Sequence, residues 1–227
     1  MPCKKPPFPK KGCFQKTKAT NIMKIVIASN NKHKISEIKA ILHEKVSKDI
    51  ELFSLSEIGF FDDIEENGKT FEENALIKAM AVADLGYMAM ADDSGLMVDR
   101  LDGAPGVYSA RYAGEPCNDE NNNQKLLLAL EGTAPHERSA KFVSTIAFVD
   151  PARKDHALFA RGECPGEILY EYRGNGGFGY DPLFYYAPLD KTFAELTAEE
   201  KNSISHRARA LDVFCEMLKK ELNIGEE

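Results

Sequence analysis

Hydrophobic and polar positions from Met23 onward follow two alternating periods. The short run "KIVIAS" is rich in β-branched residues, which predicts a strand, and the apolar residues after it are spaced three or four apart, which predicts an amphipathic helix. The next apolar run, "IELFSL", predicts a second strand. The apolar face of the helix consists of Ile35, Ile38, Leu42 and Val46.

A second helix and a third strand follow an acidic loop. Thr70 and Glu73 form a T-x-x-E capping box, so we predict that a helix begins there and runs to about Leu85, where Gly86 ends it. The apolar run "YMAMA" then predicts a buried strand that leads into "DDSG". Strands that alternate with helices in this way predict parallel pairing, with the helices covering the sheet.

The middle of the chain has the pattern of antiparallel strands. "AKFVSTIAFVD" and "HALFARGE" predict two long strands joined by a turn, and "GVYSARYAG" and "GECPGEILYEYRG" predict hairpins. "CNDENNNQKLLLALEG" predicts a helix with a polar start. We therefore expect an α/β fold with an elongated mixed β-sheet and two lobes that flank a cleft. The last helix carries an apolar stripe of Ile204, Ala208, Leu211, Cys215, Leu218 and Leu222.

The composition narrows the class of protein. With 227 residues, 43% of them hydrophobic, the chain can form one large α/β domain or two lobes that share a cleft. A net charge of −7 argues against binding to duplex DNA, and no apolar run approaches the roughly 18 residues of a membrane span, so we expect neither nucleic acid nor membrane as a partner. Five scattered cysteines without a C-x-x-C pair are typical of a reduced protein, which predicts a cytoplasmic location.

The first 22 residues differ from the rest of the chain. They contain six lysines, four prolines and no acidic residue, and they show neither an alternating nor a helical apolar pattern. We predict that residues 1–22 form a disordered basic extension and that the folded domain covers residues 23–227.

The turn between the first strand and the first helix is unusually basic. A helix start favours acidic residues because its unpaired N–H groups and its dipole make it partly positive, yet this one carries two lysines and a histidine. A bound anion would explain the arrangement, since Lys34 can reach over an anion held at the helix N-terminus. The alternative is a solvated, lysine-rich surface turn. The residues of this candidate anion site are Ser29, Asn30, Asn31, Lys32, His33 and Lys34.

Two pairs of adjacent carboxylates are candidates for chemistry. Asp92 and Asp93 follow an apolar strand, and neighbouring side chains of a strand point to opposite faces, so one can face the cleft while the other makes structural hydrogen bonds. A carboxylate placed there can hold Mg²⁺ or accept a proton from water. Glu65 and Glu66 are a second source of oxygen ligands. The alternatives are an ordinary Asp-Ser-Gly turn and charge at a helix start.

Two later motifs have the residue types of a base-binding site. In "GNGGFGYDPLF", the glycines allow close backbone approach, Phe178 and Tyr180 offer flat faces for stacking, and Asp181 can accept hydrogen bonds from a base edge. The alternative is a glycine-rich hairpin with an aromatic plug. In "EEKNSISHRARAL", donors for a phosphate or a base carbonyl cluster at the start of the last helix, where a merely polar helix start is the alternative. These residues are Lys201, Ser205, His206 and Arg207.

Together and in this order, the motifs are specific. The stretches "SNNKHK", "FEENALIKA", "ADDSGLMVDRLDGAPGVYSARYAGE", "GGFGYDPLF" and "AELTAEEKNSISHR" resemble the inosine/xanthosine triphosphate pyrophosphatase family, from Met23 to about Leu222. The resemblance implies a two-lobed α/β fold, a homodimer and a Mg²⁺-dependent active site between the lobes. The implied reaction is attack of water on a nonstandard purine nucleoside triphosphate (ITP, dITP or XTP), which releases pyrophosphate and leaves the monophosphate.

The resemblance also implies residue roles. Asp93 would be the base that activates water and a metal contact, with Ser94 beside it, and Lys34 would be the main cation for the triphosphate. Glu65 would be the metal-associated glutamate, with its neighbour Glu66 as the alternative. The turn reads Ser-Asn-Asn where many relatives have Thr-Gly-Asn, which keeps the hydroxyl. The triphosphate would contact Ser29, Asn30, Asn31, Lys32, His33 and Lys34, and the purine would contact Phe178, Gly179, Tyr180, Asp181, Lys201, His206 and Arg207.

Two other functions remain as hypotheses. One is a non-catalytic nucleotide sensor that uses the same cleft, and the other is a Maf-type pyrophosphatase that acts on modified pyrimidine nucleotides. The base would be chosen through the purine 6-keto group, accepted by donors such as Arg207, because the 6-amino group of adenine would leave those donors unpaired.

Overall fold

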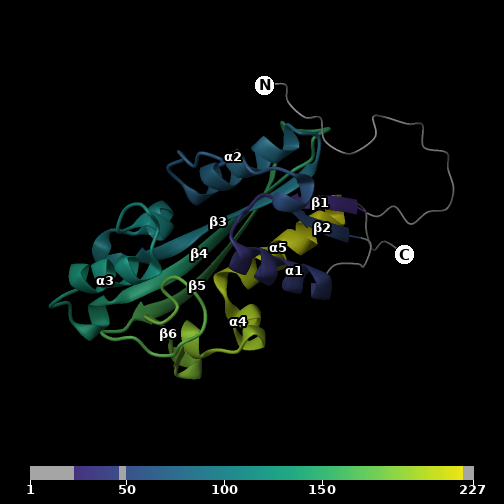
Figure 1. Cartoon of the computed structure of the whole chain (residues 1–227). Coiled ribbons are helices and arrows are strands. Elements are labelled where there is room, and N and C mark those ends of the chain that lie inside the picture. The colour runs from purple at the N-terminus through teal and green to yellow at the C-terminus, as the bar shows by residue number, and fades with distance from the viewer. Residues whose placement is uncertain (1–22, 46–49, 222–227) are drawn as a thin grey trace, which may run out of the picture.

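The computed structural model describes residues 23–45 and 50–221, which form a seven-stranded mixed sheet with helices on both faces (Figure 1). The predicted extension of residues 1–22 lies outside the described residues, as do Val46 and Leu222 of the predicted helical stripes. No helix in the described part of the chain is long and apolar enough to cross a membrane. The strands are β1 (Met23–Ile27), β2 (Ile50–Ser54), β3 (Met88–Val98), β4 (Ser139–Val149), β5 (Leu158–Ile168), β6 (Phe184–Tyr186) and β7 (Lys191–Thr192), and the helices are α1 (Lys32–Lys45), α2 (Phe71–Ala83), α3 (Asp119–Ala129), α4 (Ala198–Ile204) and α5 (His206–Glu221).

The sheet changes from parallel to antiparallel pairing at β3. The strand order is β2-β1-β3-β4-β5-β6-β7, in which β1 pairs with β2 and β3 in parallel and every later pair is antiparallel. The last parallel pair is Ile27 with Met90, whereas β3 and β4 stay paired as far as Val98 and Ala140. Among the described residues, no strand therefore pairs with the β1 side of β3 beyond Met90, and the turn between β1 and α1 begins there.

The first lobe has a different core on each face of the sheet. On β1, Ile25 and Ile27 pack with residues of α1 and α5, while Val26 and Ala28 pack with residues of α2. This two-residue alternation is the pattern expected of a strand buried on both faces. Most residues on the α2 face are alanines, so α2 packs closely against the sheet.

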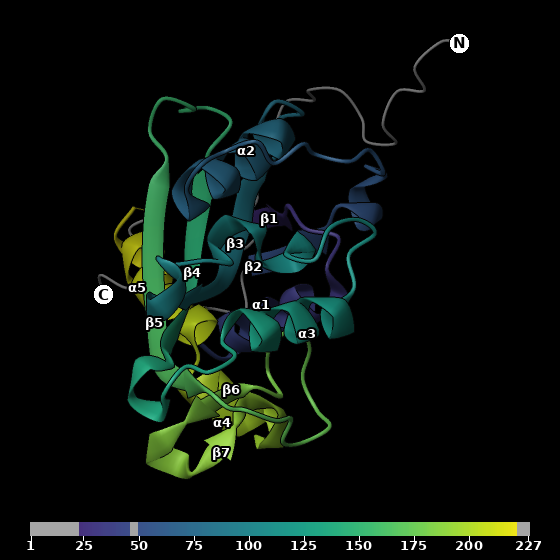
Figure 2. The same cartoon turned by 90° about the vertical axis from the view of Figure 1, so that its left-hand side faces the viewer.

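The second lobe is built on the far ends of the long strands. Leu96, Phe142, Phe184 and Phe193 form its core together with Leu126 of α3. Figure 2 shows β6, β7 and α4 gathered at this end of β4 and β5, and α2 at the opposite end. The predicted elongated mixed sheet with two lobes is confirmed.

Local predictions were correct for most of the helices. The Thr70 hydroxyl accepts a hydrogen bond from the Glu73 amide at 3.1 Å and caps α2, but the Glu73 carboxylate accepts from the Lys69 amide rather than completing the capping box. The two long antiparallel strands and the polar-start helix α3 also form as predicted. The predicted last helix is divided, because Ser205 has an extended backbone between α4 and α5.

Three predictions of strand ends and hairpins were wrong. The strand "YMAMA" does not end at Asp92 but continues to Val98, since β4 pairs with its whole length. "GVYSARYAG" is not a hairpin but contains a 3-10 helix, Gly106–Arg111, which the Ser109 hydroxyl attaches to β3 by accepting from the Leu96 amide at 2.9 Å. "GECPGEILYEYRG" is not a separate hairpin because its first half is the end of β5.

Candidate active site

Asp92 and Asp93 lie on opposite faces of the sheet, because they continue the alternation of β3. Met90 packs in the core shared with α1 and α5, and Ala91 packs in the core under α2. Asp92 is two residues beyond Met90 and Asp93 is two beyond Ala91, so their carboxylates point toward different helices. The structure thus gives the two aspartates different partners at the point where the neighbouring strand β1 has ended.

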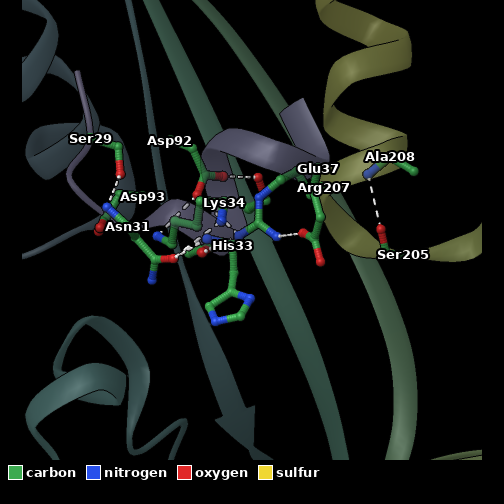
Figure 3. A network of polar contacts seen from close by, with 12 residues as sticks. Ser29, Asn31, His33, Lys34, Glu37, Asp92, Asp93, Ser205, Arg207 and Ala208 are labelled. Atoms are coloured by element: carbon green, nitrogen blue, oxygen red, sulfur yellow. Dashed lines mark hydrogen bonds and ion pairs between the residues drawn. The ribbon is translucent and has the colours of Figure 1, made fainter. Parts of the chain in front are cut away.

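Asp92 is the buried anion of an ion-pair network (Figure 3). One of its oxygens lies 3.0 Å from Lys34 Nζ and 3.2 Å from Arg207 Nη2, and the other accepts from the Ser144 hydroxyl. Burial raises the pKa of Asp92, but the charges of Arg207 and Lys34 outweigh it and hold the pKa well below its usual range. Asp92 therefore stays ionised and acts as a structural counter-ion.

The basic turn is organised by its own side chains. The Asn31 side-chain oxygen accepts from the amides of His33 and Lys34 at 3.0 and 3.1 Å, so Asn31 is the N-cap of α1, and the Ser29 hydroxyl accepts from the Asn31 amide at 3.1 Å. Lys34 has a counter-ion within the chain, Asp92, which the sequence prediction of a cation paired only with a triphosphate had missed. Asn30 and Lys32 are exposed on the same turn.

Asp93 belongs to a second cluster, under α2. Its two oxygens lie 2.9 Å from Lys78 Nζ and 3.3 Å from Asn74 Nδ2, and Lys78 Nζ lies 2.9 Å from a Glu66 oxygen as well. Burial raises the pKa of Asp93, and the charge of Lys78 opposes this shift without cancelling it. At Glu66, burial also acts to raise the pKa, but the interactions with Lys78 and its neighbours outweigh it and the pKa is lowered. Two carboxylates therefore converge on one ammonium group.

Glu66 is the glutamate that the fold brings to Asp93. It lines the same cavity as Asp93 and shares Lys78 with it, whereas Glu65 is exposed and is not among the residues of that cavity. The sequence had left Glu65 and Glu66 open as alternatives, with Glu65 preferred. The geometry favours Glu66.

The sequence prediction did not include Lys78 or Asn74. Both lie on the buried face of α2, alongside Phe71, Ala75 and Val82. A lysine and an asparagine at helical spacing among apolar residues indicate that polar partners lie nearby, because a charged group is rarely buried without a partner. That signal was available in "FEENALIKAMAVA".

Two cavities meet at the start of α1. One cavity, of about 280 Å³, is lined by the basic turn and by Glu66, Lys78 and Asp93; we name it the phosphate-side cavity after the predicted triphosphate contacts. The other, of about 120 Å³, is lined by the glycine-aromatic loop and the start of α5; we name it the base-side cavity after the predicted base contacts. Lys34 and Ser94 line both cavities, so the two are adjacent.

Side chains of the base-side cavity form hydrogen bonds and ion pairs with neighbouring groups of the chain. Asp181 is buried, and one of its oxygens accepts from Lys201 Nζ at 2.7 Å and from the Phe178 amide at 2.9 Å. Burial raises the pKa of Asp181, with Lys201 opposing the shift. These two contacts show that this Asp181 oxygen anchors the loop. The Tyr180 hydroxyl donates to the Ser109 carbonyl at 2.8 Å, and burial raises the Tyr180 pKa.

Glu37, which the sequence prediction also missed, joins the base-side residues to the Asp92 network. Its carboxylate lies 3.1 Å from Lys201 Nζ and pairs with the Arg207 guanidinium (Figure 3). Arg207 Nη2 also donates to the Ser94 hydroxyl at 2.9 Å. Both terminal nitrogens of the guanidinium are therefore engaged within this chain, whereas Nε is buried without a hydrogen-bond partner among the described residues.

His206 is the least engaged polar group of the base-side cavity. Its ring stacks on Phe142 at 4.8 Å between centroids, and its Nδ1 is buried without a hydrogen-bond partner among residues 23–45 and 50–221. Burial and the Arg207 charge lower the pKa of His206 well below its usual value, so the imidazole is neutral at pH 7. Ser205 does not line the cavity but caps α5, since its hydroxyl accepts from the Ala208 amide at 3.2 Å.

The carboxylates fit a magnesium ion only in combination with a ligand. No group of three His, Cys, Asp or Glu side chains that could hold a metal occurs in the described part of the chain. Mg²⁺, however, is commonly bound by one or two carboxylates together with substrate phosphates. Asp93 and Glu66, which already converge on the Lys78 ammonium, provide such a pair.

Comparison with known proteins identifies the family. The Ham1 family model matches residues 25–217. The chain belongs to the Ham1 family. A dITP/XTP pyrophosphatase of Geobacter sulfurreducens is 52% identical to this Ham1-family chain over 196 residues, which cover 86% of the chain and 96% of that protein. One of Desulforamulus reducens is 50% identical over 197 residues, with the same coverage.

Solved structures of Ham1 proteins have the same fold. The Ham1 protein of Staphylococcus aureus is 45% identical, with a TM-score of 0.77, and that of Coxiella burnetii is 43% identical, with a TM-score of 0.79. Each match covers 87% of this Ham1-family chain and 99% of the other one. The family resemblance inferred from the motifs is thereby confirmed.

Proposed function

We propose that this chain is a nucleoside triphosphate pyrophosphatase that hydrolyses nonstandard purine nucleotides (ITP, dITP and XTP) to the monophosphate and pyrophosphate. The observation that carries the proposal is that the two cavities are adjacent and share Lys34 and Ser94. A nucleotide that occupies both has its base beside Phe178 and its phosphates along the basic turn. The relatives of Desulforamulus reducens and Geobacter sulfurreducens are dITP/XTP pyrophosphatases, which supports the same activity.

Asp93 is the proposed general base. A water oxygen attacks the phosphorus nearest the ribose, its proton passes to Asp93, and the bond from this phosphorus to the bridging oxygen breaks, so that pyrophosphate leaves. Burial raises the pKa of Asp93 and makes its carboxylate a better proton acceptor, while Lys78 opposes this shift and orients the carboxylate. Asp92 is excluded from this role because Arg207 and Lys34 hold its pKa well below its usual range, which makes its carboxylate a weak proton acceptor.

Mg²⁺ is the proposed cofactor, held by Asp93 and Glu66 with phosphate oxygens of the substrate. When bound, it offsets the charge of the triphosphate and acts as a Lewis acid. The position of Lys78 between the same two carboxylates supports this assignment, since it marks a place that favours positive charge. Lys34 and the N-terminus of α1 add further positive potential on the phosphate side.

His206 is the proposed donor to the purine 6-keto group. A neutral imidazole carries one N–H and one acceptor nitrogen, and its unpartnered Nδ1 leaves hydrogen-bonding capacity for a ligand. A 6-keto base satisfies a donor at this place, whereas the 6-amino group of adenine does not. An unpaired buried donor costs about 1–3 kcal/mol, which favours ITP over ATP by roughly 5- to 150-fold.

A panel of triphosphates tests the proposal. ITP, dITP, XTP, GTP, ATP and a modified pyrimidine triphosphate are incubated with the protein and Mg²⁺, and the products are identified by ion-exchange chromatography. We expect monophosphate and pyrophosphate from the first three, little product from ATP, and none when Mg²⁺ is chelated. Asp93→Asn is the control, in which turnover is lost while the far-ultraviolet circular dichroism spectrum is retained.

The same panel separates the alternative functions. Tight binding of ITP without turnover would support the nucleotide sensor, and preference for the modified pyrimidine would support a Maf-type enzyme. Orthophosphate as the direct product, or equal turnover of ATP and ITP, would contradict the proposed reaction. The homodimer and the cytoplasmic location stay predictions, and light scattering coupled to size-exclusion chromatography checks the first of them.

A further inference from the structure

Phe178 of the base-side cavity belongs to a loop whose backbone is held by hydrogen bonds that do not hold the Phe178 ring. Gly177 and Gly179 on either side have left-handed φ values of +73° and +61°. The Phe178 amide donates to Asp181 at 2.9 Å, and the Gly179 amide donates to Asp119 at 2.7 Å. These bonds hold the main chain, while the orientation of the ring depends on side chains that touch it.

Two such side chains contact the ring from different parts of the chain. Lys201 Nζ lies 4.7 Å from the ring centroid, and the His33 imidazole stacks on the ring at 5.2 Å between centroids with an interplanar angle of 16°. Phe178 and Lys201 line the base-side cavity, but His33 does not. The imidazole therefore packs on the ring without being part of the cavity lining, whereas Lys201 approaches the ring as a cavity residue.

The position of His33 is itself well determined. Its amide donates to the Asn31 side chain at 3.0 Å, which makes it part of the capped first turn of α1. Figure 3 shows its ring pointing away from the network of Lys34, Asp92 and Arg207. The stack thus connects the basic turn of the phosphate side to the loop of the base side.

We propose that His33 is a positioning residue for the base: it stacks on Phe178 and holds that ring against the base-side cavity, without contacting the phosphates. This replaces the sequence prediction that His33 binds the triphosphate. The proposal rests on the proposed function only for the identity of the nucleotide. The contact between His33 and Phe178 does not depend on that function.

Kinetics of His33 variants test the proposal. Stacked aromatic pairs contribute enough to change affinity by roughly two- to tenfold, so His33→Ala is expected to raise KM for ITP by this factor and to change kcat by less than about twofold. His33→Phe keeps a ring and restores the wild-type KM. His33→Gln keeps polarity without a ring and behaves like His33→Ala. Alanine and glutamine are good helix formers, so α1 persists in both.

Inorganic triphosphate separates a base effect from a phosphate effect. It has no base, so its inhibition constant against ITP hydrolysis is expected to be unchanged in His33→Ala. An increase in this constant equal to the increase in KM would place His33 at the phosphates and overturn the proposal. So would a wild-type KM in His33→Ala, or an equally raised KM in His33→Phe.

A second measurement needs no turnover. The chain contains no tryptophan, so Phe178→Trp places a single tryptophan at the stack, which can be excited at about 295 nm without exciting the eight tyrosines. In nucleotide-free protein we expect its fluorescence anisotropy to fall when His33→Ala is added and to stay high with His33→Phe. Equal anisotropy in all three proteins would overturn the proposal. Failure of ITP hydrolysis by the wild type would instead reject the proposed function and leave this readout interpretable.

Discussion

Asp92 and Asp93 are chemically identical neighbours on β3, and the structure predicts opposite consequences for their neutralisation. Asp92→Asn removes a buried counter-ion from Lys34 and Arg207, whereas Asp93→Asn removes a carboxylate whose ionised form is disfavoured by burial. We expect the first variant to be destabilised and the second to be folded but inactive.

The magnitude follows from what each substitution leaves behind. Removal of one partner of a buried ion pair costs about 3–5 kcal/mol. Arg207 keeps Glu37 and Ser94 as partners, and the Lys34 side chain, which is 16% exposed, can turn toward water. The loss of unfolding free energy in Asp92→Asn is therefore expected near the lower limit of that range, about 3 kcal/mol. For a chain of this size, this loss lowers Tm by roughly 6–12 °C. Asp93→Asn leaves Lys78 paired with Glu66, so we expect about 1 kcal/mol or less.

Differential scanning calorimetry and urea unfolding of the two variants provide the assay. The pKa of Asp92 is depressed in the folded state, so its contribution is complete above the ordinary aspartate value of 3.8 and is lost as the pH falls toward the folded pKa. The difference between wild type and Asp92→Asn should accordingly shrink on acidification below that value. The reasoning would be refuted if both variants had the same Tm, or if Asp93→Asn were the less stable one.

Two further predictions concern the Asp93 cluster. Lys78→Met removes the cation that opposes the effect of burial at Asp93, so the Asp93 pKa rises further. We expect the acid limb of the kcat/KM pH profile to move to higher pH, together with a loss of rate. An acid limb that does not move would count against Asp93 as the base. Glu66→Gln is expected to raise the Mg²⁺ concentration for half-maximal activity at least tenfold, while the matched change at the exposed neighbour, Glu65→Gln, leaves it within about twofold. The reverse order in a Mg²⁺ titration would restore Glu65 as the metal-associated glutamate.

Much of the fold and part of the site could be predicted from local patterns. The helical spacing of apolar residues located α1, the capping box located the start of α2, and the long apolar runs located the antiparallel pair β4 and β5. The alternation of a strand predicted that Asp92 and Asp93 point to opposite faces. The strand itself continues through both residues because β4 pairs with it. The order of the motifs was sufficient to identify the family.

The remaining features depend on partners distant in sequence. The continuation of β3 to Val98 depends on β4, and the 3-10 helix Gly106–Arg111 depends on the contact of Ser109 with β3. The preference for Glu66 over Glu65 arises only when α2 brings Lys78 to Asp93.

The sequence by itself therefore determined most of the helices, the long antiparallel strands, the alternation of the carboxylates and the family. Tertiary structure alone decided which charges neutralise one another: Lys34 with Asp92, Arg207 with Glu37, and Lys78 with Asp93 and Glu66. The physical reason is that the attraction between opposite charges is strongest, and an unpaired charge most costly, where both groups are withdrawn from water. Burial is a property of the assembled lobes rather than of any short segment.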